Sequence, residues 1–377
     1  MDSTYQQYSR KCWANVRCHD VRDALNNANF DECFETDNLN DICNMWTNLF
    51  LKTAKEIIPN KVVTIRPNDS PWYTNELRKM KKNMLHLFHK HKKSKLASDW
   101  QKYTKARNDY QKGLNEAEVI YKKSLTKSLT SNRNSKKWWS TINWLLGKGG
   151  DTSYPSLNVG GEQINDNKEK AESFNNFFLS HSNIDETGAS LPDDDEFPNN
   201  FNDIVATEDE VHDLLRSIDI SKATGPDEIS PKLLFEAGLS IVPSLTKLIN
   251  LSLSTGKVPR DWKLANVIPL FKKGNKHERN NYRPVSLLSC VSKILERIVF
   301  KHFYNFLREN MLLSKHQSGF QPGDSTVNQL SYLYHAFAEA LDQKKDVHIV
   351  FCDIKKAFDR VWHKGLIYKL RKIGVRG

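Results

Sequence analysis

The sequence lacks long apolar runs and any organised pattern of cysteines. No segment approaches the roughly 20 consecutive apolar residues of a membrane span, and the N-terminus has no apolar stretch of a secretory signal. The six cysteines include no Cys-x-x-Cys pair and no histidine at zinc-finger spacing. A membrane span, a disulfide scaffold and a zinc framework are therefore not expected, and reduced thiols in an intracellular setting are the default.

The charge of the chain is concentrated in one segment. The 377 residues are 38% hydrophobic, enough for at least one core and for two or three domains, and their formal net charge is +11. Residues 78–148 hold 19 Lys/Arg against four acids, a local charge of +15 that leaves −4 for the rest. A solvated charged face is one explanation of such a stripe. We expect a nucleic-acid-binding surface, because basic stripes are typical of proteins that bind phosphates.

Two clusters within this basic segment leave alternatives open. Histidines at 86, 89 and 91 lie close together but between lysines, so a solvated basic helix face is a commoner explanation than a metal site. Tryptophans at 138, 139 and 144 close the segment. Their indoles either stack on bases or fix the last helix to the next domain.

Proline, glycine and charge patterns divide the chain into four regions. We expect an N-terminal region with an amphipathic helix, a basic helical region, a turn-rich linker and a final mixed region, at 1–70, 71–148, 149–205 and 206–377. The linker includes an acidic run at 193–196, and helical spacing of apolar residues predicts one short helix near 167–180.

The final region has the clearest element boundaries. Thr207 and Glu210 form a capping-box pattern, and Ser230-Pro231 supplies an N-cap and a first-turn proline for a helix that stops at Gly238. Periodicity predicts further helices, at about 240–255, 290–308 and 325–343. Apolar runs predict strands at 266–271 and 347–352. The region is therefore predicted to be α/β (α+β).

The second predicted strand ends at an acidic residue, Asp353. An aspartate after an apolar strand is ordinarily a turn or cap residue. Phosphoryl transfer with two metal ions, however, needs carboxylates on a rigid element, and a strand end supplies that rigidity. Asp353 is therefore a candidate metal ligand.

Four segments of the final region carry a resemblance to a known family through their order and spacing. They are Lys222-Ala-Thr-Gly-Pro-Asp-Glu-Ile229, Val267-Ile-Pro-Leu-Phe-Lys-Lys-Gly274 with Asn281-Tyr-Arg-Pro-Val-Ser-Leu-Leu288, His316-Gln-Ser-Gly-Phe-Gln-Pro-Gly-Asp-Ser-Thr326, and Phe351-Cys-Asp-Ile-Lys-Lys-Ala-Phe-Asp-Arg-Val361. Together they resemble the reverse transcriptase domain of non-LTR (LINE-like) retrotransposons, particularly jockey-like elements.

The resemblance implies a fragment of a right-hand polymerase fold. Residues 206–377 would form the fingers and the beginning of a partial palm, preceded by a mainly α-helical basic connector at 71–148 and by the tail of an endonuclease region at 1–70. The family's paired aspartate motif is expected beyond Gly377. The parent protein would be an RNA-directed DNA polymerase, and this chain is expected to be inactive alone.

The resemblance also assigns roles to individual residues. Asp353 corresponds to the first catalytic aspartate and would bind Mg²⁺ (or Mn²⁺) in the complete enzyme. Phe358 would lie under the sugar of the incoming nucleotide and disfavour a 2′-hydroxyl. The triphosphate would be held by Lys272, Lys273 and Arg283, and Gln317 would lie against template and nucleotide. Arginine suits this task because its planar fork pairs two oxygens.

The implied partners are an RNA template, a DNA primer and deoxynucleoside triphosphates, with no membrane. The implied location is the nucleus, a cytoplasmic ribonucleoprotein, or both. A non-enzymatic nucleic-acid-binding remnant or host-adopted protein that uses the basic segment is the alternative function. A viral RNA-dependent RNA polymerase is a third reading, since a second acid, Asp359, follows Asp353, but Phe358 argues against it.

Overall fold

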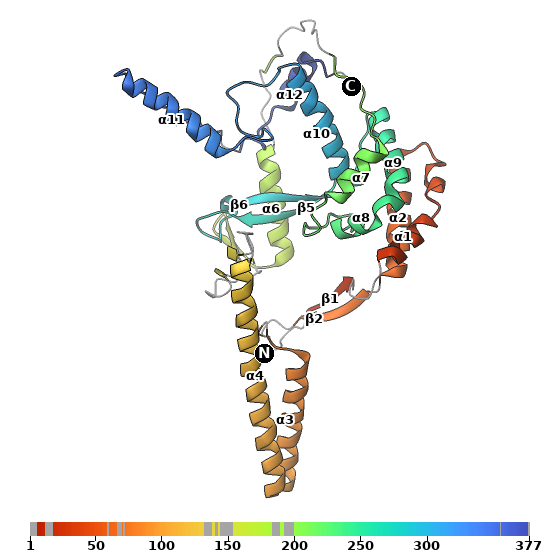
Figure 1. Ribbon diagram of the computed structural model, residues 1–377, viewed down its shortest axis with the longest axis vertical. Helices are drawn as coiled ribbons and strands as arrows, with labels where there is room; N and C mark the ends of the chain where they lie inside the picture. Colours follow the sequence, from red (N-terminus) through yellow and green to blue (C-terminus); the bar gives the residue numbers. More distant parts are fainter. Residues whose placement is uncertain are drawn as a thin grey trace. The chain divides into compact units, whose positions relative to one another are not determined.

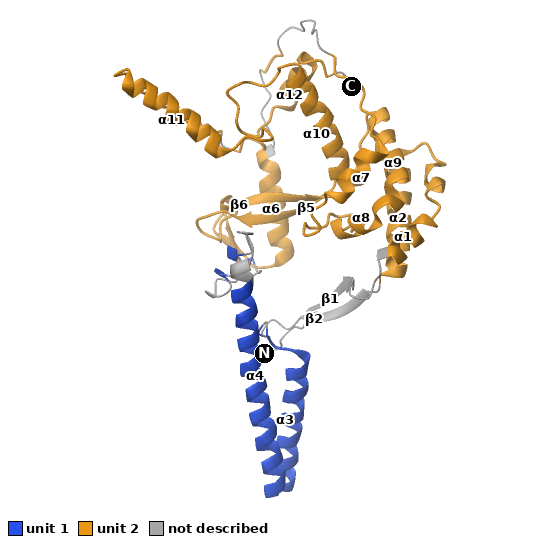
Figure 2. Cartoon of the chain, viewed as in Figure 1, with its two compact units in different colours: residues 1–10, 61–154 blue, residues 11–60, 155–377 orange. Residues whose placement is uncertain are grey.

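The chain divides into two compact units in the computed structural model. The structure describes residues 6–11, 18–58, 60–65, 70, 72–131, 138–139, 142–143, 154–182, 189–191, 200–354 and 356–375. Unit 1 comprises residues 1–10 and 61–154, and unit 2 comprises residues 11–60 and 155–377 (Figure 2). Trp144 and the acidic run at 193–196 lie outside the described residues. Strands β1 (Gln6–Lys11) and β2 (Asn60–Ile65) pair as a two-stranded sheet.

Unit 1 is built on a hairpin of two long helices. Helix α3 (Asn75–Ser94) and helix α4 (Ala97–Ser131) pack side by side (Figure 1). The Thr74 hydroxyl accepts the Leu77 N–H at 3.3 Å and so caps α3, while Lys95 ends this helix in the left-handed conformation at φ 54°. The helical structure predicted for the basic region at 71–148 is confirmed as far as residue 131.

Aromatic side chains join the two helices of this hairpin. The rings of Phe88 and Tyr103 lie 5.3 Å apart, and the hydroxyls of Tyr73 and Tyr110 are 2.9 Å apart. Burial, and to a smaller extent this hydrogen bond, raises the pKa of Tyr110 to about 12. Leu77 is the one residue of α3 that is fully buried. The hairpin therefore has a narrow core and a large solvent-exposed surface.

Unit 2 contains the main hydrophobic core. Three N-terminal elements pack against helices from the middle of the chain. The N-terminal elements are α1 (Cys18–Asn26), η2 (Phe30–Phe34) and α2 (Leu39–Ile57). The elements from the middle of the chain are α7 (Glu208–Arg216), α8 (Pro231–Ala237), η3 (Gly238–Ile241), α9 (Val242–Thr255), η4 (Arg260–Lys263) and α10 (Ser292–Glu309). Trp46 on α2 is fully buried, and its indole N–H donates to the Ser244 hydroxyl on α9 at 3.0 Å. Residues 18–58 therefore share one core with the region after 206.

Local sequence signals set the helix boundaries of this core. Thr207 and Glu210 form the predicted capping box, and Ser230 with Pro231 begins α8 as predicted. Gly238 ends α8 at φ 52°. Glu210 also accepts hydrogen bonds from Lys301 (2.6 Å) and His302 (3.3 Å) on α10. Burial opposes ionisation, but these partners outweigh it and lower the pKa of Glu210.

One stretch of this core is apolar enough, by length and composition, to cross a membrane. It is Pro231–Thr255, and half of its most apolar window is buried inside the protein. Three separate elements divide it, because Gly238 interrupts the helix. Its apolar side chains belong to the core of unit 2. This burial accounts for the composition, and a single such stretch is weak support for a span.

Two β-hairpins and one helix form a second, smaller core in unit 2. Strands β3 (Leu157–Val159) and β4 (Glu162–Ile164) pair with each other, as do β5 (Ala265–Phe271) and β6 (Tyr282–Leu288), the latter two flanking η5 (Arg279–Asn281). Leu157, Phe174 and Tyr282 are buried together, with Phe174 on α6 (Asn167–Ser182). The helix near 167–180 and the strand near 266–271 are confirmed, whereas β6 was not predicted.

Two prolines face each other across the β5–β6 hairpin. Pro269 is the cross-strand partner of Pro284. Three residue pairs further toward the turn, the Lys272 N–H donates to the Asn281 carbonyl at 2.8 Å. Hydrogen-bonded and non-hydrogen-bonded pairs alternate along an antiparallel ladder. The prolines therefore occupy a pair that exchanges no N–H bond, and the ladder between the strands is intact.

The described residues that follow α10 form helices but no strand. Helices α11 (Thr326–Asp342) and α12 (His363–Lys372) form, and the helix predicted at 325–343 is confirmed. The strand predicted at 347–352 is wrong, because this segment has no regular structure. A strand needs a hydrogen-bonded neighbour, and no described residue pairs with this segment. The described elements are thus mixed, with helices predominating, which agrees with the broad α+β class.

Candidate functional site

The β5–β6 hairpin presents basic side chains on one exposed face. Arg283 lies directly opposite Leu270. Lys272 directly follows β5, two residues after Leu270, and its N–H donates to the Asn281 carbonyl, so the pairing continues to it. Side chains two residues apart share a face of a strand, so Lys272 and Arg283 are diagonal neighbours. Both are exposed, as is Lys273 at the strand end. Within the described part of the chain no ion pair engages these three cations, so their charge is available to an anion.

The opposite face of the hairpin is held by aromatic packing. Phe271 and Tyr282 form a cross-strand pair with ring centroids 5.5 Å apart. Tyr282 also meets Phe174 of α6 edge-to-face at 4.9 Å, and its hydroxyl donates to the Lys276 carbonyl at 2.7 Å. The aromatic face thus fixes which way the hairpin lies on α6. The basic face is directed away from this contact as a consequence.

Asp353 lies on an exposed segment without regular structure. Neighbouring apolar side chains are exposed as well, with Phe351 at 89% and Ile354 at 73%. No hydrogen bond or ion pair among the described residues joins Asp353 to Lys272, Lys273 or Arg283.

Phe358 makes a contact that connects two of the sequence motifs. Its ring meets that of Phe320 edge-to-face at 6.1 Å, although the two side chains are 81% and 86% exposed. Phe320 has a positive φ of 62°, and the Gln317 side chain upstream donates to the Gly319 carbonyl at 3.1 Å. Phe358 and the segment that contains Gln317 are therefore neighbours.

A second contact links the loop after Asp353 to α6. Lys356 Nζ lies 5.2 Å from the centroid of the Phe177 ring, and the Arg279 guanidinium lies 5.0 Å from the same centroid. Arg279 also donates to the Ser173 carbonyl at 3.3 Å. Sequence reasoning missed this cluster. Arg279 and Lys356 are each more than a hundred residues from Phe177 along the chain, so no local pattern could have indicated the cluster.

The turn around Gly225 packs closely on the end of β6. A β-carbon on Gly225 would lie 2.5 Å from the Leu288 carbonyl oxygen and 2.7 Å from Ser289 N. Asp227 supports the turn by accepting the Ile229 N–H at 3.3 Å. Burial raises the pKa of Asp227, and a hydrogen bond from Ser289 opposes this shift. This packing is a structural reason for the Gly-Pro-Asp sequence.

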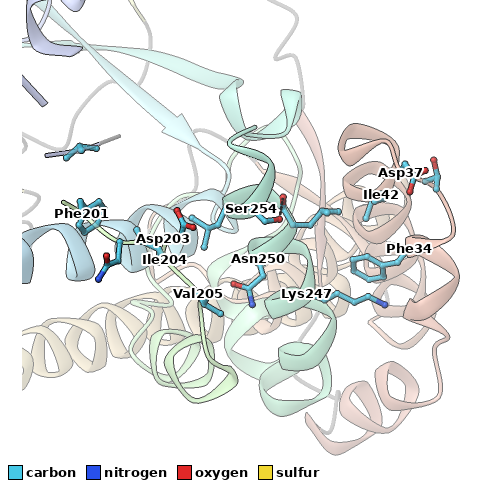
Figure 3. Close-up of a pocket in the computed structure, with 15 residues that line it drawn as sticks. Phe34, Asp37, Ile42, Phe201, Asp203, Ile204, Val205, Lys247, Asn250 and Ser254 are labelled. Carbon is cyan, nitrogen blue, oxygen red and sulfur yellow. Dashed lines mark hydrogen bonds between the residues drawn. The ribbon is translucent and has the colours of Figure 1, made fainter. Parts of the chain in front are cut away.

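A pocket of about 780 Å³ lies elsewhere in unit 2 (Figure 3). None of the predicted site residues lines it. Two of its polar side chains are engaged in packing contacts, because Asn250 makes two hydrogen bonds to the backbone of Ala206, and Lys247 lies 3.4 Å from Asp31 and over the ring of Phe34. We therefore interpret the pocket as part of the packing between η2, α9 and residues 201–206.

The described residues do not form a complete metal site. A carboxylate such as that of Asp353 suits Mg²⁺, which prefers oxygen ligands. Among the residues that the structure describes, however, no group of three His, Cys, Asp or Glu side chains could hold a metal ion. Asp353 can therefore supply one ligand of a metal site.

Comparison with known proteins identifies the C-terminal part of the chain. Residues 271–377 match the family model described as reverse transcriptase (RNA-dependent DNA polymerase). This chain carries part of a reverse transcriptase domain. It is 34% identical over 166 residues to a probable RNA-directed DNA polymerase from transposon BS of Drosophila melanogaster, which covers 44% of this chain and 18% of that relative.

Other relatives of this reverse transcriptase domain are also polymerases of mobile elements. The chain is 32% identical over 170 residues to the RNA-directed DNA polymerase from mobile element jockey of Drosophila melanogaster (45% of this chain, 19% of the relative). It is 28% identical over 127 residues to a Pol polyprotein from retrotransposable element R2 of Popillia japonica (34% and 17%). The domain is of the non-LTR retrotransposon type, and the chain spans less than a fifth of the length of these relatives.

Proposed function

We propose that this chain contributes the fingers and the beginning of the palm to an RNA-directed DNA polymerase. The observation that carries the proposal is the β5–β6 hairpin, which spans the start of the matched reverse transcriptase segment and exposes Lys272, Lys273 and Arg283 within it. Three exposed cations at the end of a hairpin suit a triphosphate, because charge-assisted bonds to phosphate oxygens are strong. In this proposal they bind the incoming deoxynucleotide.

Asp353 and Phe358 act on the same nucleotide in the proposal. Asp353 supplies one carboxylate to a divalent metal, as reverse transcriptase domains generally use such ions, and the other ligands come from the rest of the polymerase. Phe358 excludes a ribose 2′-hydroxyl by steric contact, and Gln317 lies against template and nucleotide. The Phe320–Phe358 contact supports this assignment because it brings the two motifs together.

Unpartnered apolar surface supports a place in a larger polymerase. Helix α11 has no buried residue, with Val327 67% exposed and Leu330 64% exposed, and the segment before Asp353 exposes Phe351. Exposed apolar patches on soluble proteins often mark interaction surfaces. We infer that further polymerase structure covers α11 and pairs with residues 347–352. The same proposal includes an RNA template, a DNA primer and a nuclear or cytoplasmic ribonucleoprotein location.

The proposal can be tested in a chimera. The 170 residues that align with the jockey polymerase replace the corresponding residues of that relative, and primer extension on an RNA template is measured with Mg²⁺. Asp353→Asn is expected to abolish extension, because the amide has no charge to hold a cation. Phe358→Ala is expected to keep deoxynucleotide incorporation and to admit ribonucleotides, because the exclusion is steric.

The matched control is Asp346→Asn, at an exposed aspartate outside the four motifs. This variant should retain extension. An active chimera that is unaffected by Asp353→Asn would contradict the metal-ligand assignment. An unchanged ratio of kcat/KM values for deoxy- and ribonucleotides in Phe358→Ala would remove Phe358 from the sugar contact. Charge removal in Lys272→Gln/Arg283→Gln should raise the nucleotide KM more than it lowers kcat.

A further inference from the structure

The tip of the α3–α4 hairpin, residues 88–105, exposes aromatic rings among lysines. Trp100 is 46% exposed, and Leu96 in the turn is 58% exposed. The Trp100 ring is supported from within the hairpin by His91 at 5.0 Å and by Tyr103 at 5.3 Å. An indole that is fixed by neighbouring rings and still half-exposed is a ready surface for stacking, since little side-chain freedom is left to lose.

The charge of this tip is almost entirely positive at its surface. Residues 88–105 contain six lysines and one acid, Asp99. Asp99 is only 5% exposed, accepts the Ser94 hydroxyl at 2.6 Å and lies 3.6 Å from Lys90. The hydrogen bond from Ser94 is the largest cause of a lowered pKa of Asp99. Burial opposes this shift, and the charges of Lys90 and Lys102 add to it. The acid is therefore ionised but directed into the turn.

The remaining lysines of the tip lie on both sides of the turn and are exposed. Lys92, Lys93 and Lys95 lie at the end of α3, whereas Lys102 and Lys105 are three residues apart on α4 and so share a helix face. Within the described residues no ion pair engages any of these five. A surface of this kind would attract phosphates, and stacking would then occur where the bases are unpaired.

We propose that the tip of the α3–α4 hairpin binds single-stranded nucleic acid, with Trp100 stacked on a base and the surrounding lysines on the phosphates. The alternative for the rings is that they only close the hairpin. That role does not require lysines on both helices or an exposed indole. The proposal is independent of polymerase activity, because no residue of unit 2 takes part.

The test uses the full chain and fluorescence anisotropy with three labelled probes: oligouridine RNA, oligothymidine DNA and an RNA duplex. Trp100→Leu is expected to weaken binding of single strands about fivefold or more, which is the lower end for loss of one stacked base. Binding of the duplex should not change, because its bases are already stacked. Trp100→Phe should retain much of the affinity, and helicity measured by circular dichroism should be equal in all variants.

A matched pair of triple variants tests the position of the phosphate contacts. Lys92→Gln/Lys93→Gln/Lys95→Gln at the tip should reduce the log–log salt slope for single strands by about 2, at about 0.7 for each phosphate contact. The control removes three lysines near the start of α3, in Lys79→Gln/Lys81→Gln/Lys82→Gln, and should change the slope less. Equal losses in both triple variants, or unchanged affinity in Trp100→Leu, would overturn the proposal. The RNA and DNA probes show which single strand is preferred.

Discussion

Substitution of Gly225 by alanine should destabilise unit 2 strongly. The added β-carbon would lie 2.5 Å from the carbonyl oxygen of Leu288 and 2.7 Å from both Leu288 C and Ser289 N. All three neighbours are backbone atoms at the end of β6, so no side chain can rotate away. Overpacking of a core commonly costs about 1–3 kcal/mol. Because backbone must move here, we expect a loss of about 3 kcal/mol in the free energy of unfolding.

Urea unfolding followed by near-ultraviolet circular dichroism measures this effect, because buried Trp46 and Trp262 report on unit 2. With a typical slope of about 2 kcal/mol per molar urea, the midpoint of Gly225→Ala should fall by about 1.5 M. The control is Gly319→Ala, where nothing lies within 4 Å of the added carbon. Equal midpoints for the two variants would refute the close packing of the Gly225 turn against β6.

Three further predictions concern the core, one ion cluster and the thiols. Trp46→Ala should destabilise unit 2 by about 3–5 kcal/mol in urea unfolding, because it leaves a large cavity; a loss below 1 kcal/mol would contradict the shared core. Glu210→Gln should lose about 1 kcal/mol at neutral pH. Since the folded pKa of Glu210 is lowered, the difference from the unaltered chain should persist above the unfolded pKa and vanish as pH falls through the folded value. Cys352 is exposed, so Cys352→Ser should remove one fast-reacting thiol in maleimide labelling. Burial raises the pKa of Cys43 to about 12, so Cys43 should stay unreactive until the protein unfolds.

Element boundaries set by local chemistry could be predicted from the sequence. Thr207 and Glu210 cap α7, and Ser230 with Pro231 begins α8, because these signals act within one turn of a helix. The helices at 242–255, 292–309 and 326–342 follow their apolar periodicity for the same reason. Each prediction depends only on neighbours along the chain.

Predictions that depend on distant residues were less successful. The segment before Asp353 has a strand-like composition but no hydrogen-bonding neighbour among the described residues, so no strand forms. Strand β6 was not predicted, because it contains Pro284 and proline is rare in strands. Proline is tolerated at this position because Pro284 and Pro269 form a pair that exchanges no N–H bond. The contact between Trp46 and Ser244 joins positions 198 residues apart, which no local pattern could indicate.

The candidate site likewise combines residues that sequence motifs indicate with contacts that depend on distant parts of the chain. Lys272, Lys273 and Arg283 were selected from sequence motifs, and the register of β5 and β6 gives Lys272 and Arg283 a common face. The contact of Phe358 with Phe320 could not be read from either motif alone. The roles of these residues, like the metal-binding role of Asp353, stay predictions that the experiments above address.

The facing prolines of the β5–β6 hairpin also limit how far this sheet can grow. In a non-hydrogen-bonded pair, backbone N–H groups would point outward, to the free edge of each strand. At Pro269 and Pro284 there is no such hydrogen, so both edges lack a donor at mid-strand. An incoming strand would lose a bond on either side, which is how natural sheets discourage edge-to-edge aggregation. The hairpin is thereby protected against recruitment of further strands while its basic face stays open.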